Sequence, residues 1–133
     1  MSTASLRPGA AFKGAMIGGA AAGVVNLSIF FAFGAAGAAY MMDQGGQPMK
    51  IPLVMPFAST MMAALAASGV LAALLKFAPQ KAWTVFLGVS VLVFLAYGAL
   101  PVMALDAGDT LGIVSLELMH VVAALGIVGG MRR

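Results

Sequence analysis

The sequence predicts an all-α integral membrane protein, a four-helix bundle in up-down-up-down order with both termini in the cytoplasm. Three observations predict it. The 133-residue chain is 62% hydrophobic and 8% charged, whereas a soluble domain carries about 25% charged residues. It contains four long apolar runs, and most of its cations fall on one side of a four-span arrangement. We therefore expect one domain, residues 1–133, for which the lipid bilayer is the solvent.

Each apolar run is long enough to cross the hydrocarbon core as a helix. A core of about 30 Å needs about 20 helical residues. The four runs cover approximately residues 14–40, 52–75, 82–105 and 110–131. A soluble amphipathic helix would show a polar face, which these nearly continuous apolar runs lack.

The connections between the runs are short. Residues 41–51 are polar and contain glycine and proline, and residues 76–81 contain a proline that cannot continue a helix. Residues 106–109 form a turn in which Asp109 is placed to cap the last helix. Because short connections make consecutive helices antiparallel, the bundle is expected to run up-down-up-down.

The distribution of charge predicts the orientation. The side that holds both termini carries six cations: Arg7, Lys13, Lys76, Lys81, Arg132 and Arg133. The opposite side carries Lys50 with three acids: Asp43, Asp106 and Asp109. Cationic loops stay in the cytoplasm, so we expect cytoplasmic termini. The net charge of +3 is then a topology signal, and we expect no nucleic-acid partner.

The first predicted helix is rich in small residues. Its glycines repeat at GxxxG spacing in two pairs: Gly14 with Gly18, and Gly19 with Gly23. This spacing lets two helices in lipid approach closely, and it predicts a helix-association face, used within the bundle or between copies. Residues 36–38 resemble a signal-peptidase site, but the preceding apolar run is much longer than the about 7–15 residues of a signal sequence.

Three polar residues within the predicted spans stand apart from the serines and threonines, which can bond to their own helix backbone: Asn26, Glu117 and His120. At 1.5 Å per residue, Glu117 lies about 12 Å beyond Asp109 and His120 about 4–5 Å deeper. Glu117 and His120 share one helix face because they are three positions apart. Asn26 and Ser90 fall at similar depths, so we expect a polar layer that forms a candidate ligand site.

Two interpretations of this layer stay open. It is either a buried network of uncharged hydrogen-bonding groups, or a site that binds a proton or a small ligand. Ionisable groups inside membranes often mark transport paths and proton relays. Because four helices rarely enclose a pore, a transport function would require an oligomer.

The composition excludes several kinds of chemistry. The chain has no cysteine, which removes disulfides, zinc–thiolate sites and thiol nucleophiles. Glu117 and His120 form a Glu-x-x-His motif, but a di-iron bundle needs two such motifs and two further glutamates. The chain has one glutamate and one histidine, so we expect no metal and no cofactor.

Two chemical alternatives remain for these residues. A haem could use His120 with one of the 11 methionines, and an intramembrane enzyme acting on lipid or quinone would have to use Glu117 and His120. No catalytic triad, P-loop or dinucleotide fingerprint is recognisable, so we expect a protein without enzymatic activity.

The sequence resembles a group of small bacterial integral membrane proteins of uncharacterised function with four predicted spans. Three segments carry the likeness: GVVNLSIF around Asn26, VMPFAST at the second helix, and residues 118–124 followed by a basic tail. The resemblance implies the bacterial inner membrane and supplies no activity. We predict a non-enzymatic component that self-associates or joins a larger membrane protein. The alternative is an oligomeric, proton-linked or small-solute transporter or channel module.

Overall fold

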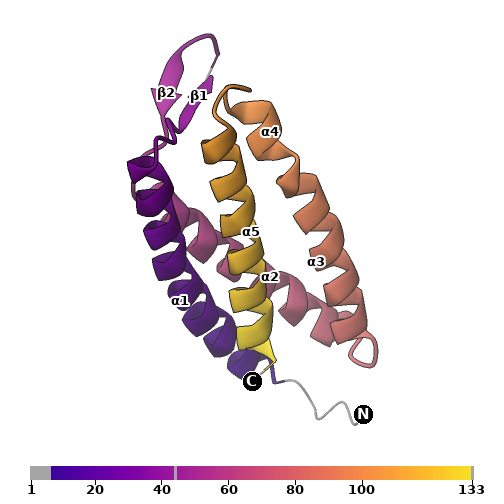
Figure 1. Ribbon diagram of the computed structural model, residues 1–133. Coiled ribbons are helices and arrows are strands. Elements are labelled where there is room, and N and C mark those ends of the chain that lie inside the picture. The colour runs from indigo at the N-terminus through magenta and orange to yellow at the C-terminus, as the bar shows by residue number, and fades with distance from the viewer. Residues whose placement is uncertain (1–6, 44, 133) are drawn as a thin grey trace.

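The computed structural model describes residues 7–43 and 45–132, and it is mostly helical with a small β-hairpin at one end (Figure 1). Its elements in chain order are α1 (Pro8–Ala35), β1 (Met41–Asp43), β2 (Pro48–Lys50), α2 (Met55–Phe77), α3 (Ala82–Gly98), α4 (Leu100–Ala104) and α5 (Thr110–Met131). Within these residues, four segments are long and apolar enough to cross a membrane, with α3 and α4 counted together. This indicates a multi-pass membrane protein, as the sequence predicts.

Helix α1 begins and ends earlier than the predicted range 14–40. Pro8 lies in its first turn, where a backbone N–H has no acceptor within the helix, so proline costs no hydrogen bond there. At the other end Gly37 adopts a φ of 109°, and its N–H donates to the carbonyl of Gly34 at 3.1 Å, as in a Schellman motif. The helix therefore ends at Ala35, and the following residues lead into a hairpin that the sequence analysis described only as a polar connection.

Prolines set the boundaries of the next two spans. Helix α2 begins at Met55 because Pro52 first closes a turn, its carbonyl accepting the Met55 N–H at 2.9 Å. The third span, predicted as one helix over residues 82–105, is divided at Ala99 into α3 and α4. Pro101 lacks an N–H, and its ring conflicts with the carbonyl four residues earlier, so the helix bends there.

The helices pack unequally. Helix α1 packs chiefly against α5 and α2, whereas α3 makes fewer contacts with its neighbours. The buried residues of α3, Ala82 and Phe86, both lie in its first two turns. Figure 1 shows α3 and α4 as an outer layer beside α5. The upper part of α3 is therefore the least covered part of the bundle.

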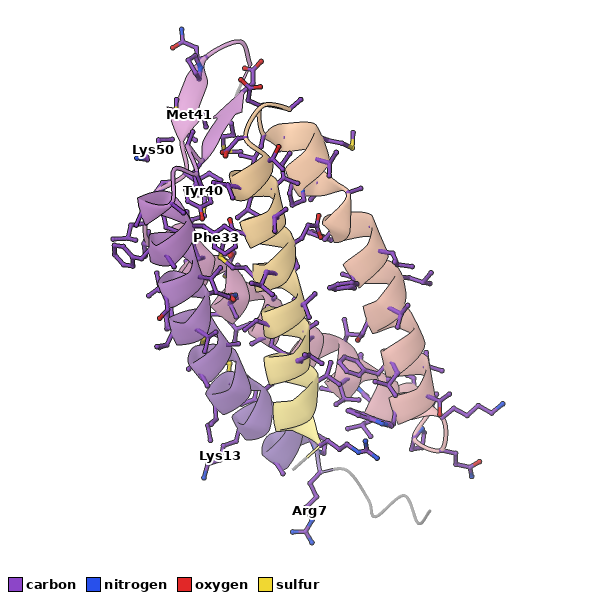
Figure 2. The ribbon with its side chains drawn as sticks, viewed as in Figure 1. Arg7, Lys13, Phe33, Tyr40, Met41 and Lys50 are labelled. Atoms are coloured by element: carbon purple, nitrogen blue, oxygen red, sulfur yellow. The ribbon has the colours of Figure 1, made fainter. Side chains whose placement is uncertain are left out.

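The two ends of the bundle differ in charge. The start of α1 and the end of α5 lie at one end, and the hairpin lies at the other (Figure 1). Figure 2 shows Arg7 and Lys13 at the first end and Lys50 at the hairpin end. Lys76 in the last turn of α2 lies with the first group. The charge asymmetry of the sequence thus becomes a separation between the two ends.

Glycines bring α1 and α5 into close contact. A β-carbon added at Gly14 would overlap the carbonyl of Gly130, and one added at Gly18 would overlap the carbonyl of Gly126. The contact is reciprocal, because a β-carbon at Gly126 would lie 2.8 Å from the carbonyl oxygen of Gly18. We call these four residues the glycine seam. The pair on α5 also has GxxxG spacing, which the sequence analysis did not single out.

The other two glycines of the predicted association face lie against α2. A β-carbon at Gly19 would lie 2.8 Å from the β-carbon of Ala64, and one at Gly23 would lie 2.7 Å from the ring of Phe57. Together with the glycine seam, these contacts mean that α2 and α5 of the same chain pack against the four glycines of the predicted association face. Contacts between copies of the chain would need another surface.

Replacing Gly18 with alanine should lower the free energy of unfolding by about 1–3 kcal/mol, the usual cost of overpacking, because the opposing group is backbone. Gly69 of α2 is the matched control, since an added β-carbon there meets nothing within 4 Å. Thermal unfolding in detergent, followed by circular dichroism, measures both variants. Equal midpoints for Gly18→Ala and Gly69→Ala would contradict the glycine seam.

Candidate functional site

Asn26 joins three helices at the centre of the bundle. Its side chain is only 2% exposed. The amide nitrogen donates to the hydroxyl of Thr60 on α2 at 3.0 Å and to the backbone carbonyl of Met119 on α5 at 3.1 Å. The Thr60 hydroxyl in turn donates to the carbonyl of Pro56 at 2.7 Å. A single amide therefore links α1, α2 and α5 through one continuous chain of donors and acceptors.

The acceptors fix the orientation of the Asn26 amide. The Met119 carbonyl can only accept, and the Thr60 proton is already donated to its own helix, so the amide NH₂ must face both. The Asn26 Oδ1 atom is then buried without a protein donor among the described residues. The sequence pattern points to Asn26 but not to Thr60, because a threonine in a membrane helix can be satisfied by its own backbone. The Thr60 hydroxyl does bond to its own helix, but it still has a lone pair free to accept from Asn26.

Glu117 and His120 lie on a different face of α5. Glu117 and Met119 are two positions apart, so their side chains point about 160° away from each other on the helix. A β-carbon at Gly98 of α3 would lie 3.5 Å from Glu117 Oε2, which places this carboxylate against α3. His120 shares the face of Glu117 because the two are three positions apart.

The pair contains buried polar atoms without protein partners. Glu117 Oε1 and His120 Nδ1 are both buried, and neither has a hydrogen-bond partner among the described residues. Both side chains as a whole are partly exposed, and so is Ser90 on α3. Buried polar groups are normally satisfied, and an unsatisfied one costs free energy. The two atoms are therefore available to a proton or a small ligand.

The predicted polar layer is thus divided into two parts. Asn26 belongs to the tightly packed junction of α1, α2 and α5, whereas the Glu117 carboxylate lies against the loosely packed α3 at Gly98. The physical reason is the glycine seam, which turns one face of α5 toward α1 and leaves the opposite face for α3. Helical depth, which the sequence supplies, places residues at one level but does not say which faces meet.

Few other titratable groups lie on the helices near this pair. The titratable side chain of α3 is Tyr97, which is 57% exposed, and that of α2 is Lys76 in its last turn. The pair therefore carries the titratable chemistry of this interface within the described residues. In general, a carboxylate oxygen or an unprotonated imidazole nitrogen accepts hydrogen bonds and becomes a donor when it binds a proton.

Tyr40 and Asp109 form a latch at the hairpin end. Asp109 caps α5, as predicted, by accepting the Gly112 N–H at 2.9 Å. The same carboxylate accepts the backbone N–H of Tyr40 at 2.8 Å and that of Ala39 at 3.3 Å. Tyr40 itself has a φ of 53°, a backbone conformation rare for a bulky residue. The carboxylate thus holds the chain between α1 and the hairpin onto the start of α5.

The Tyr40 side chain continues this latch into the bundle, between α1 and α5 (Figure 2). Its ring stacks on Phe30 with centroids 4.0 Å apart, and its hydroxyl lies 2.8 Å from the Ser115 hydroxyl. The Tyr40 hydroxyl can also donate to the Phe30 carbonyl at 3.3 Å and the Ser115 hydroxyl to the Gly112 carbonyl at 2.9 Å, so either hydroxyl can be the donor between them. Burial raises the pKa of Tyr40 above its ordinary value of 10.0, and the nearby Asp109 carboxylate raises it further against the opposing effect of Ser115.

The residues present do not form a metal centre. Within the described part of the chain, no group of three or more His, Cys, Asp or Glu side chains could hold a metal ion. Glu117 and His120 supply two potential ligands, fewer than the three or four protein ligands typical of a zinc site.

Comparison with known proteins identifies a family without an assigned activity. A family model described as a family of unknown function, DUF6069, matches residues 7–133. No curated protein and no solved structure matches the chain. The function has to be argued from the site.

Replacing Thr60 with valine should lower the free energy of unfolding by about 1 kcal/mol, because one N–H of the buried Asn26 then lacks an acceptor. Ser28 is the matched control, since its exposed hydroxyl donates only to Val24 of its own helix. Ser28→Ala should change stability by less than about 0.5 kcal/mol. If Thr60→Val unfolds at the same denaturant concentration as Ser28→Ala, the hydrogen bonds of the three-helix junction do not contribute to the free energy of unfolding.

Replacing Tyr40 with phenylalanine should give a stability difference that depends on pH. Because the pKa of Tyr40 is raised in the folded state, the folded state keeps the Tyr40 proton to higher pH than the unfolded state. The stability that this difference contributes is complete below about pH 10 and is lost as the pH rises through the raised pKa. The difference in unfolding midpoint between wild type and Tyr40→Phe should therefore shrink above about pH 10. Tyr97→Phe, which changes an exposed tyrosine, is the control for the removal of a hydroxyl. A constant difference for Tyr40→Phe would refute the assignment.

Proposed function

We propose that this chain, which belongs to the DUF6069 family of unknown function, is a non-enzymatic bacterial inner-membrane component that binds and releases a proton at Glu117 and His120. It would cross the membrane four times, up-down-up-down, with both termini in the cytoplasm. The separation of charge between the two ends of the bundle supports this orientation, since cationic ends stay in the cytoplasm.

One observation carries the proposal. Glu117 Oε1 and His120 Nδ1 are buried atoms of ionisable groups, they lie on one face of α5, and neither has a hydrogen-bond partner within the part of the chain that the structure describes. A polar group within the membrane is costly unless it pairs. A chain that needed only a stable apolar bundle would gain nothing from Glu117 and His120 at these positions. A proton taken up by either atom turns that atom into a hydrogen-bond donor, so each of the two atoms is a candidate for binding a proton.

The surroundings of the pair favour exchange with the exterior. The upper part of α3, which faces Glu117 at Gly98, is loosely packed and ends at the bend before Pro101. A helix with few contacts and a proline bend opens at lower cost than the packed core of α1, α2 and α5. The junction at Asn26, in contrast, is the rigid part against which α3 could move.

A path for protons through the membrane would require more than one chain. We propose that the protein acts as a homo-oligomer or with a larger membrane-protein partner, because four helices rarely enclose a pore. The four glycines of the predicted association face pack against α5 and α2, so such an assembly would use a different surface. The exposed face of α3 is the surface that we propose for this contact, because α3 lies next to Glu117.

Proteoliposomes that contain a trapped pH-sensitive dye test the proposal under an imposed membrane potential. Glu117→Gln should remove the proton flux while leaving the unfolding midpoint near that of wild type, because the substitution keeps the shape and removes the titration. His120→Ala should lower the flux as well. Tyr97→Phe is the control, which should keep the flux and the midpoint.

Infrared titration of the same samples separates proton binding from transport. The carboxylic-acid band of Glu117 should be present in wild type and absent in Glu117→Gln, and the mass of the assembly in nanodiscs reports the oligomer. A Glu117→Gln protein that loses stability and shows no difference in carboxylic-acid absorption would indicate a structural network instead. A wild-type flux in Glu117→Gln would exclude the proposed path.

A further inference from the structure

A groove lies at the hairpin end of the bundle, between the end of α1, the hairpin and the start of α2. Its volume is about 720 Å³, within the range of roughly 300–1,000 Å³ typical of small-molecule sites. Phe30 and Phe31 of α1 and Leu53 before α2 supply apolar walls, and Gly34 and Lys50 also line it. Phe31 and Leu53 are 59% and 48% exposed, so the groove opens sideways from the bundle.

The length of the apolar run in α1 leads us to expect the groove near the boundary between lipid and water. Lys13 is the charged residue within α1, and the apolar run begins after it. Counting about 20 residues, or about 30 Å, from Gly14 reaches the last turn of α1, where Gly34 lines the groove. The apolar walls therefore lie at the edge of the hydrocarbon, and the hairpin lies at the level of lipid headgroups.

Lys50 places a positive charge at the rim of this groove. Figure 2 shows it on the side of the hairpin above α1. The acids of this end bond to backbone N–H groups: Asp43 to Gly46, Asp106 to Gly108 and Asp109 to Gly112. Lys50 is the one lysine at an end that otherwise carries acids, and it is exposed in β2. The groove thus combines apolar walls below with a cation above.

We propose that this groove binds an anionic phospholipid, with the phosphate paired to Lys50 and one acyl chain lying against Phe31 and Leu53. A cation at the rim and apolar walls below it match a lipid whose headgroup is negative and whose acyl chain lies deeper in the membrane. A soluble anion would use the charge but not the apolar walls, and a zwitterionic lipid would bring its own cation to Lys50. The proposal does not depend on the proton site, which lies on α5.

The latch at Tyr40 explains why the groove has a fixed shape. Tyr40 also lines the groove, and its ring is held by the stack on Phe30 and by the Ser115 hydroxyl. The carbonyl of Tyr40 accepts the N–H of Ile51 at 2.9 Å, which ties the strand that carries Lys50 to the end of α1. The cation and the apolar walls are therefore held together before any lipid binds.

Thermal unfolding of the full chain in a neutral detergent tests this proposal. Added phosphatidylglycerol should raise the unfolding midpoint more than phosphatidylcholine does, because a ligand that binds only the folded state stabilises it. Lys50→Gln should lose most of this difference. Lys76→Gln is the matched control, since it removes a lysine at the opposite end, and it should retain the wild-type response.

A second variant tests the apolar part of the site. A β-carbon at Gly34 would approach only the Tyr40 ring, at 3.7 Å, so Gly34→Leu should fold, fill the groove and reduce the response to phosphatidylglycerol with Lys50 intact. Its midpoint in phosphatidylcholine reports whether it folds. Equal responses of Lys50→Gln and Lys76→Gln would overturn the proposal, and so would an equal shift produced by inorganic phosphate alone.

Discussion

The close approach of α1 and α5 is the constraint on which the rest of the structure depends. Lipid tails are as apolar as leucine side chains, so helices in a bilayer gain little from burying apolar surface against each other. They gain from contact at short range, which the glycine seam allows by removing every β-carbon between Gly14 and Gly130 and between Gly18 and Gly126. The same approach lets Asn26 reach the backbone of Met119 and lets Tyr40 reach Ser115.

This contact also divides the polar chemistry of α5. The face of α5 toward α1 and α2 is closed, and there the Asn26 amide nitrogen bonds to Thr60 and to the Met119 carbonyl while its Oδ1 stays without a donor among the described residues. The opposite face meets α3, whose packing is loose and which the Glu117 carboxylate approaches at Gly98. Glu117 and His120 each keep a buried atom that has no partner among the described residues. A structural junction and a candidate proton site thus occupy one helix at similar depth, separated by the direction of their side chains.

The hairpin end is organised by one carboxylate. Asp109 satisfies the first turn of α5 and also binds the backbone that leaves α1. This double use fixes Tyr40 beneath the hairpin and positions the strand of Lys50 over the end of α1. The groove at this end is therefore a consequence of how α1 terminates, because a helix that continued to Tyr40 would leave no room for the latch.

The sequence by itself determined the four apolar spans, the turn at Asp109 and the separation of charge, because bilayer thickness and capping chemistry act on local segments. It also identified Asn26, Glu117 and His120, because polar groups are rare in such segments. Only the tertiary structure decided their partners. The helices are apolar on every face, so no amphipathic pattern shows which side turns inward. The pairing of Gly126 with Gly18, the partnership of Asn26 with Thr60 and the isolation of Glu117 toward α3 all follow from how the helices pack.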